Sequence, residues 1–296
     1  MSLWYRVDTE VSRRHGAVML IYIPLAIVLI VVILAVLRYG AFVLSNGIAG
    51  QLSEIHEGVG QMDRAVGKGM LTAVAADCIV LPSSLLALLP ERDGFVPGTP
   101  VLMVHGLYHN KSAWMMFRRR FKQAGFTNLH TYQYNSFTKD FDTALAGMEA
   151  KLDQMLAHNP DVKVVLVGHS LGGLVSRCVA GKPEYRDRVA ALITLGSPHK
   201  GSDLAWLGGN RMARDLIPGR YISQTVEGTA DPDCPRLGIY TLTDDYVFPL
   251  EMLQTGRSGW QERICSPMSH VWMLFSKEVA EMVIGFLRAS KVSNAE

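Results

Sequence analysis

The segment from Val164 to Gly173 joins a strongly apolar run to a Gly-His-Ser-Leu-Gly turn and a helical pattern. This arrangement predicts a nucleophile elbow, in which Ser170 stands on a sharp turn between a strand and a helix. Gly168 and Gly172 meet the steric requirement, because strand and helix can approach this closely only over small residues. The Leu171 N–H then lies at a helix N-terminus, where free donors and the helix dipole stabilise an oxyanion. The expected chemistry is attack by Ser170 on a carbonyl carbon.

A second apolar run, residues 101–107, ends in His105-Gly106-Leu107. In sites of this kind the other oxyanion donor comes from the loop after an earlier strand, so we predict the backbone N–H of Leu107 as that donor. Gly106 allows the backbone to turn toward the nucleophile. His105 precedes the elbow, and we expect it to hold this loop by hydrogen bonding rather than to act as the catalytic base.

A serine at its ordinary pKa is a poor nucleophile, so the site requires a base and an orienting acid, in the chain order Ser, Asp or Glu, His. Asp244 and Asp245 follow a run of strand composition, residues 237–242. An acid at the carboxyl end of a strand is where a triad carboxylate belongs. We prefer Asp244, because Val247 then follows three residues later as in Asp-x-x-Val loops, and Asp245 is the alternative.

The predicted base is His270. It lies between the last strand-like run, residues 261–265, and a terminal helical pattern that begins at Val271. A histidine on such a loop can bring its imidazole over the nucleophile. The chain has nine histidines, and this is the only one after the two aspartates.

Three segments resemble bacterial lipases and esterases of the α/β-hydrolase superfamily: Val-His-Gly-Leu at 104–107, Gly-His-Ser-Leu-Gly-Gly at 168–173 and Leu-Gly-Ser-Pro-His-Lys-Gly-Ser at 195–202. In that family a Thr/Ser-Pro-His-x-Gly-Ser stretch follows the strand after the elbow and leads toward the cover of the active site. The resemblance spans about residues 98–290 and implies a mostly parallel sheet with helices on both faces. The chain departs from the family in its doubled aspartate and in Ser-His, where Gly-His is frequent, at 269–270.

The segments between the predicted strands have amphipathic helical spacing, at residues 111–124 and 140–157, as a parallel sheet requires. The basic run Arg118–Arg120 is typical of a solvated helix face. The formal net charge of +2 does not favour nucleic-acid binding.

Residues 200–235 alternate short apolar helical pieces with Gly-Gly and Pro-Gly. Such a segment can form a lid or acyl-binding cover, for which Leu204, Trp206 and Leu207 are the substrate-contacting candidates. An ordinary excursion packed on the core is the alternative interpretation.

Near the amino end, Ala17–Leu37 is an uncharged apolar stretch of 21 residues. As a helix it would be about 30 Å long, which matches a bilayer core. We predict an uncleaved anchor rather than a signal peptide, because the apolar region of a signal peptide is shorter and no clear cleavage site is present. Three arginines (Arg6, Arg13, Arg14) precede the stretch and Arg38 follows it, which favours a cytoplasmic segment 1–16 and a catalytic domain outside the cytoplasm, most simply on the inner membrane.

Residues 38–97 are predicted to be a helical, membrane-proximal connection, and residues 98–296 the catalytic domain. Within the connection, residues 70–89 are apolar but contain Asp77 and Pro82. We therefore expect this piece to rest on the membrane or on the domain rather than to span the bilayer. A second span would return the catalytic domain to the cytoplasmic side.

The four cysteines, Cys78, Cys178, Cys234 and Cys265, show no metal-ligand spacing, and the sequence has no phosphate loop or dinucleotide fingerprint. No metal or cofactor is expected. Cys234 and Cys265 could pair in an oxidising compartment, and free thiols are the equal alternative.

Together these patterns predict a membrane-anchored serine hydrolase that cleaves carboxylic esters of acyl lipids. Ser170, His270 and Asp244 would form its triad, with lipid as substrate and membrane as its other partner. An acyltransferase with the same triad is the first alternative. A catalytically silent fold that serves as a tethered binding protein is the second.

Overall fold

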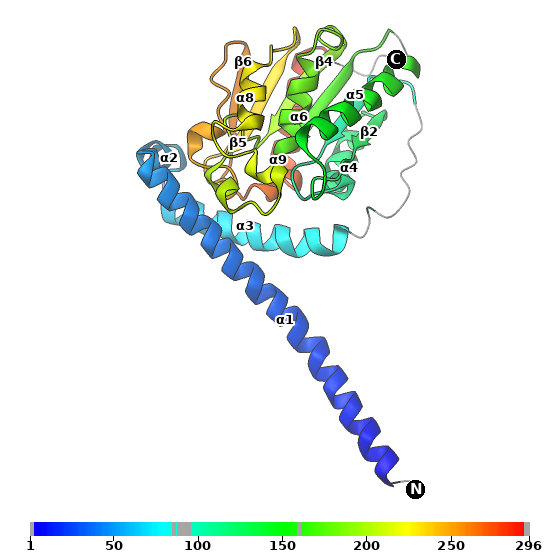
Figure 1. Cartoon of the computed structure of the whole chain (residues 1–296), viewed down its shortest axis with the longest axis vertical. Coiled ribbons are helices and arrows are strands. Elements are labelled where there is room, and N and C mark those ends of the chain that lie inside the picture. The colour runs from blue at the N-terminus through cyan, green and yellow to red at the C-terminus, as the bar shows by residue number, and fades with distance from the viewer. Residues whose placement is uncertain (1–2, 85–86, 88–95, 159–160, 293–296) are drawn as a thin grey trace.

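The computed structural model describes residues 3–84, 87, 96–158 and 161–292, and the side chains of all of these except 3–21 and 81. It consists of a layered α/β domain and a long N-terminal helix that projects from it (Figure 1). Among the described residues, three α-helices precede the domain: α1 Leu3–Ile48, α2 Leu52–Val59 and α3 Met62–Ser83.

The domain is built on a six-stranded sheet in the order β2-β1-β3-β4-β5-β6, in which every neighbouring pair is parallel. The first strand lies between β2 and β3, so the chain reverses its direction across the sheet after β2. Ligands of open parallel sheets bind at the carboxyl ends of the strands near such a reversal. The strands are β1 Val101–Val104, β2 Leu129–Tyr132, β3 Val164–His169, β4 Val189–Leu195, β5 Arg236–Thr241 and β6 Trp260–Cys265.

Helices cover both faces of the sheet. Alternate residues of a strand point to opposite faces, so they pack into two separate cores. Val101 and Met103 pack with α4 and α9, whereas Leu102 and Val104 pack with α5 and α6. Strands buried on both faces are typical of parallel sheets. The predicted α/β-hydrolase architecture is thus confirmed. The helices of the domain are η2 Lys111–Trp114, α4 Met115–Gln123, α5 Phe141–His158, α6 Leu171–Ala180, η3 Asp203–Leu207, α7 Arg211–Arg214, α8 Tyr221–Gly228, η4 Leu250–Met252, η5 Val271–Leu274 and α9 Lys277–Ala289.

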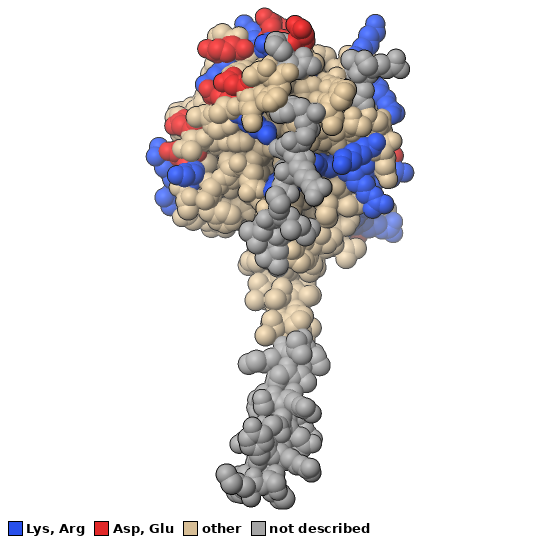
Figure 2. Space-filling model, turned by 90° about the vertical axis from the view of Figure 1, so that its right-hand side faces the viewer, with Lys and Arg blue, Asp and Glu red and all other residues tan. Residues whose placement is uncertain are grey.

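Helix α1 continues well beyond the predicted apolar stretch. Its part from Tyr22 to Ile48 is 27 residues long, and an 18-residue window within it has a mean hydropathy of 2.8, which is long and apolar enough to cross a bilayer. We call residues 22–37 the stem and residues 38–48 the seat. The stem is mostly exposed, and its described surface carries no charged side chain (Figure 2).

The seat packs into a third core together with the loop after β5. Tyr39 and Phe42 are both 2% exposed and lie in one cluster with Leu242, Phe248 and Leu250. The uncharged stretch ends at Leu37, but the helix continues through Ile48 because the seat packs against the domain.

Helix α3 lies along the domain (Figure 1) and packs against α1 and η5. Ala76 and Val80 join the same apolar core as α4 and α9. The part of the predicted 70–89 piece that the structure describes therefore rests on the domain, whereas residues 85–86 and 88–89 lie outside the described residues.

Candidate active site

Ser170 occupies a strained turn between β3 and α6. Its backbone has φ 55° and ψ −128°, a region that non-glycine residues rarely adopt. A Cβ added to Gly168 would overlap the Gly172 carbonyl oxygen, and one added to Gly172 would overlap the Val104 carbonyl oxygen. The two glycines are therefore required for β3, β1 and α6 to meet, and the serine is held at the carboxyl edge of the sheet.

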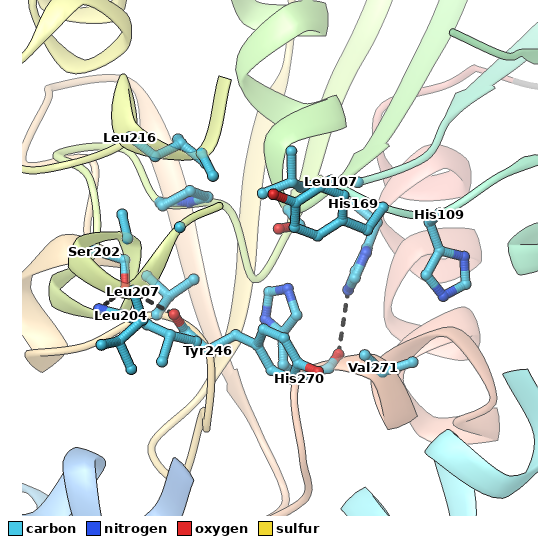
Figure 3. Close-up of a pocket in the computed structure, with 18 of the residues that line it drawn as sticks. Leu107, His109, His169, Ser202, Leu204, Leu207, Leu216, Tyr246, His270 and Val271 are labelled. Atoms are coloured by element: carbon cyan, nitrogen blue, oxygen red, sulfur yellow. Dashed lines mark hydrogen bonds between the residues drawn. The ribbon is translucent and has the colours of Figure 1, made fainter. Parts of the chain in front are cut away.

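The cavity beside the elbow has a volume of about 350 Å³ and contains both Ser170 and His270 in its wall. Figure 3 shows His270 and Tyr246 on one side of it and Leu204, Leu207 and Leu216 on another. Leu107, from the loop after β1, also lines it. The structure thus brings the predicted nucleophile, the predicted base and one predicted oxyanion-hole residue to one largely apolar cavity.

Asp244 and His270 form a buried pair. The Nδ1 of His270 lies 2.8 Å from Asp244 Oδ2, and the two side chains are 3% and 0% exposed. The other carboxylate oxygen, Oδ1, accepts the backbone N–H groups of Tyr246 and Val247 at 2.9 and 2.8 Å. The Asp-x-x-Val spacing has a structural basis, because the Val247 amide fixes the aspartate rotamer.

Asp245 also contacts His270, at the backbone instead of the ring. Its Oδ1 accepts the His270 N–H at 2.9 Å, and its Oδ2 accepts from Arg38 Nε at 2.8 Å. Burial raises the pKa of Asp245 to about 6, against the opposing effect of the Arg38 charge. Sequence reasoning offered Asp245 only as an alternative triad acid and did not foresee this contact.

His105 lies in the loop that carries Leu107, where it makes hydrogen bonds of a structural kind. Its Nδ1 donates to the Gly106 carbonyl at 2.9 Å and its Nε2 accepts the Tyr134 N–H at 3.2 Å. Burial lowers its pKa to about 4, so the ring is neutral at physiological pH. The backbone N–H of Tyr108, which follows Leu107, donates to Ser136 Oγ at 2.8 Å. The turn is thereby fixed on both sides of the Leu107 amide.

Two further histidines, His169 and His109, lie near His270, and the sequence did not predict their presence in the site. His169 donates from Nε2 to the His270 carbonyl at 3.2 Å, and its ring centroid is 4.5 Å from that of His270 (Figure 3). His109 lines the cavity, and burial together with the charge of His270 lowers its pKa to about 4. Burial also lowers the pKa of His169 well below its usual range. A single sequence gives no sign of these roles, although His169 lies within the elbow motif.

The Gly-Ser-Pro-His-Lys-Gly-Ser segment supports the site. Gly196 has φ 54°, and a Cβ there would lie 3.0 Å from His270 Nδ1 and 3.2 Å from Asp244 Oδ2. Ser202 donates to the Tyr246 carbonyl at 2.7 Å, which ties the segment to the loop that bears Asp244. His199 is buried between Arg177 and Thr194. The motif therefore leaves room for the acid–base pair and holds its loop.

The three cover candidates differ in position. Leu204 and Leu207, from η3, line the cavity (Figure 3). Trp206 is 64% exposed, and the Arg220 guanidinium lies 5.4 Å from the centre of its ring. Within residues 200–235, Ala213 and Leu216 also line the cavity.

All four cysteines are free thiols, so Cys234 and Cys265 are not paired. In the part of the chain that the structure describes, no group of three or more His, Cys, Asp or Glu side chains is placed to hold a metal ion.

Parts of the chain are similar to known proteins. Residues 96–207 match the family described as "PGAP1-like alpha/beta domain". A GPI inositol-deacylase of Candida albicans is 26% identical over 39% of this chain and 35% of its own length. A triacylglycerol lipase of Pseudarthrobacter phenanthrenivorans is 35% identical over 36% of this chain and 35% of its own. The chain thus matches about a third of each of these relatives.

Solved structures show the same fold at low sequence identity. A Bacillus licheniformis lipase in its mature form superposes with a TM-score of 0.52 at 19% identity, over 68% of this chain and 94% of that one. Aspergillus fumigatus lipase B gives a TM-score of 0.54 at 15% identity, over 66% and 54%.

The parallel sheet and the turn at Ser170 have the architecture of the α/β-hydrolase fold. Within that fold, the chain is similar over residues 96–207 to a PGAP1-like domain, and parts of it are similar to proteins named as a GPI inositol-deacylase and as a triacylglycerol lipase.

Proposed function

We propose that this protein is a membrane-anchored serine hydrolase that cleaves carboxylic esters of acyl lipids. The observation that carries the proposal is the common cavity of Ser170 and His270, with His270 Nδ1 2.8 Å from the buried Asp244 carboxylate. A strained serine, a base oriented by an acid and an apolar chamber are the components of acyl transfer to water.

In the proposed reaction, His270 Nε2 takes the Ser170 hydroxyl proton while Oγ attacks the ester carbonyl carbon. The N–H groups of Leu107 and Leu171 stabilise the oxyanion of the tetrahedral intermediate. His270 then gives the proton to the leaving alcohol, and an acyl-enzyme remains on Ser170. Water, deprotonated by His270, attacks that ester, releases the carboxylic acid and restores the serine. Asp244 holds the imidazole in the required tautomer throughout.

The lipid substrate is supported by the apolar rim of the cavity. Tyr108 and Leu207 line the cavity and are 42% and 81% exposed. The Tyr108 ring lies 5.0 Å from the ring of Phe137, which is 61% exposed. Asn210 donates from Nδ2 to the Phe137 carbonyl, which joins this rim to the 200–235 segment. Exposed apolar groups around a cavity are typical of a site that meets a lipid surface.

The membrane anchor is proposed for α1, whose stem is apolar and exposed. The proposed topology places residues 1–16 in the cytoplasm and the hydrolase domain outside it. The side chains of Arg6, Arg13 and Arg14, on which this orientation depends, lie outside the described part of the structure. The names of the relatives, a lipase and a deacylase, agree with removal of an acyl group.

The first experiment is hydrolysis of p-nitrophenyl esters from acetyl to palmitoyl by the detergent-solubilised protein. Ser170→Ala should lower kcat by at least about 10³-fold. Ser223→Ala is the matched control, because its hydroxyl only caps the Arg220 carbonyl in α8. A wild-type protein that reacts with a fluorophosphonate at Ser170 but hydrolyses no ester would favour the acyltransferase, which requires an acceptor alcohol. Failure of a folded protein to react with either reagent would favour the silent binding protein.

Chain-length preference tests the cavity. Leu207→Ser should reduce turnover of palmitoyl esters by several-fold and leave acetyl esters nearly unchanged, because it removes apolar surface from the cavity wall. Trp206→Ser is the matched control, since that exposed side chain is not part of the wall. Equal losses on short and long esters in the Leu207 variant would contradict an acyl-binding role.

A further inference from the structure

Arg38, in the seat of α1, contacts the loop that carries Asp244. The guanidinium is 13% exposed and makes three hydrogen bonds. Nε donates to Asp245 at 2.8 Å, Nη2 donates to Asp77 on α3 at 2.8 Å, and Nη1 donates to the Tyr246 hydroxyl at 3.0 Å. One cation thereby joins two N-terminal helices to the loop that carries Asp244.

The first connection from Arg38 to His270 passes through Asp245. The Asp245 side chain has no exposed surface, so its carboxylate requires a charged partner inside the protein. Arg38 occupies one carboxylate oxygen, and the backbone N–H of His270 occupies the other at 2.9 Å. His270 is thus bonded to both aspartates, through its ring to Asp244 and through its backbone N–H to Asp245, while its carbonyl accepts from His169.

The second connection passes through Tyr246. The Arg38 guanidinium carbon lies 4.8 Å from the centre of the Tyr246 ring, and that ring stacks on the His270 imidazole at 5.2 Å and 28°. Arg38 therefore also fixes the aromatic surface against which the imidazole rests. A planar guanidinium can serve both connections at once, whereas a lysine ammonium lacks that geometry.

We propose that Arg38 is a positioning residue for His270, so that the helix that forms the candidate membrane span also completes the acid–base apparatus. This inference rests on the proposed function. The groups that face Asp245 come from three segments: Arg38 and Tyr39 on α1, Asp244 and Tyr246 on its own loop, and His270 after β6; Asp77 on α3 faces the other side of Arg38.

The test compares Arg38→Gln and Arg38→Lys with wild type in hydrolysis of a short p-nitrophenyl ester from pH 5 to 9. Arg38→Gln should lower kcat by about 10- to 100-fold with KM within about 3-fold, because a small displacement of the base slows the chemical step. The acidic limb of its profile of kcat against pH should move to higher pH. Without the cation the pKa of Asp245 rises, so this carboxyl becomes protonated at a higher pH. Arg38→Lys should lie between the two proteins. Ser45→Ala is the matched control and should stay within about 2-fold of wild type, since it removes only the hydrogen bond to Asp203.

The outcomes are distinguishable. A folded Arg38→Gln protein with wild-type kcat and an unchanged pH profile would overturn the positioning role. Should that variant fail to fold, Arg38→Lys decides, and wild-type kinetics in it would show that no bridging geometry is needed. Absence of turnover in wild type would instead remove the proposed function itself.

Discussion

Asp244 and Asp245 are adjacent, both buried, and both bonded to His270, yet different regions of the molecule hold them. Asp244 takes its other hydrogen bonds from its own loop, from the amides of Tyr246 and Val247. Asp245 takes its other bond from Arg38, about 200 residues earlier in the chain. The first aspartate belongs to the hydrolase fold, and the second belongs to the interface between that fold and the N-terminal helices. The comparison teaches that neighbouring carboxylates on one loop can be held by different parts of a chain, one of them outside the α/β domain.

The largest expected effect separates the two carboxylates directly. Asp244→Asn should lower kcat by about 10³- to 10⁴-fold, because the amide favours the wrong imidazole tautomer. Asp245→Asn should cost only about 10-fold, because asparagine can still accept the His270 N–H through its side-chain oxygen. Steady-state kinetics on one short ester measure both. Equal losses would mean that the two residues share one role.

A substitution at Gly196, directly after β4, should disturb the pair formed by Asp244 and His270. Gly196→Ala places a methyl group 3.0 Å from His270 Nδ1 at φ 54°, so we expect an activity loss of about 10- to 100-fold. Gly285→Ala on α9 is the matched control, because nothing lies within 4 Å of its Cβ position. Normal activity in the Gly196 variant would show that the acid–base pair tolerates displacement.

The pH dependence of the free energy of unfolding should reveal the protonation of Asp245. Burial raises its folded pKa to about 6, above the ordinary value of 3.8. Between these values the folded protein holds a proton that the unfolded chain has lost, so this group adds stability as pH falls and removes it as pH rises through 6. The stability of wild type relative to Asp245→Asn should therefore be about 2 kcal/mol greater at pH 4 than at pH 7. Chemical denaturation of both proteins at the two pH values measures this difference, and a constant difference would contradict it.

The smallest expected effect concerns the contact between the seat and the acid-bearing loop. Tyr39 donates its hydroxyl proton to the Thr243 carbonyl at 3.0 Å. Tyr39→Phe should lower the free energy of unfolding by about 1–2 kcal/mol, since the buried carbonyl loses its partner. Tyr221→Phe, which removes an exposed bond to Asp142, should cost less than about 0.5 kcal/mol. Similar losses in the two variants would indicate that the seat is held by packing alone.

Much of the hydrolase domain could be predicted because its information is local. Apolar runs of strand length gave β1, β3 and β5, and the glycines around Ser170 indicated a tight turn. The Asp-x-x-Val spacing favoured Asp244, whose bond to the Val247 amide spans three residues. Such contacts lie within reach of a sequence pattern.

The contacts of Arg38 could not be predicted in this way. In the sequence Arg38 follows an uncharged stretch, where a basic residue is typical of the end of a membrane span. Its partners are 39, 207 and 208 residues away, and a single sequence carries no trace of such pairing. The extent of α1 escaped prediction for a related reason, since Tyr39 and Phe42 are held by the acid-bearing loop rather than by helical periodicity alone.

The continuity of α1 from stem to seat has a mechanical consequence. No turn interrupts the helix between residues 22 and 48, and its one proline, Pro24, lies near the far end of the stem from the domain, so a rotation of the stem about its axis is expected to turn the α/β domain with it. One residue inserted at the junction would turn the domain by about 100° around the stem axis and raise it by about 1.5 Å. The number of residues between stem and seat therefore sets the direction, around the helix axis, in which the cavity opens.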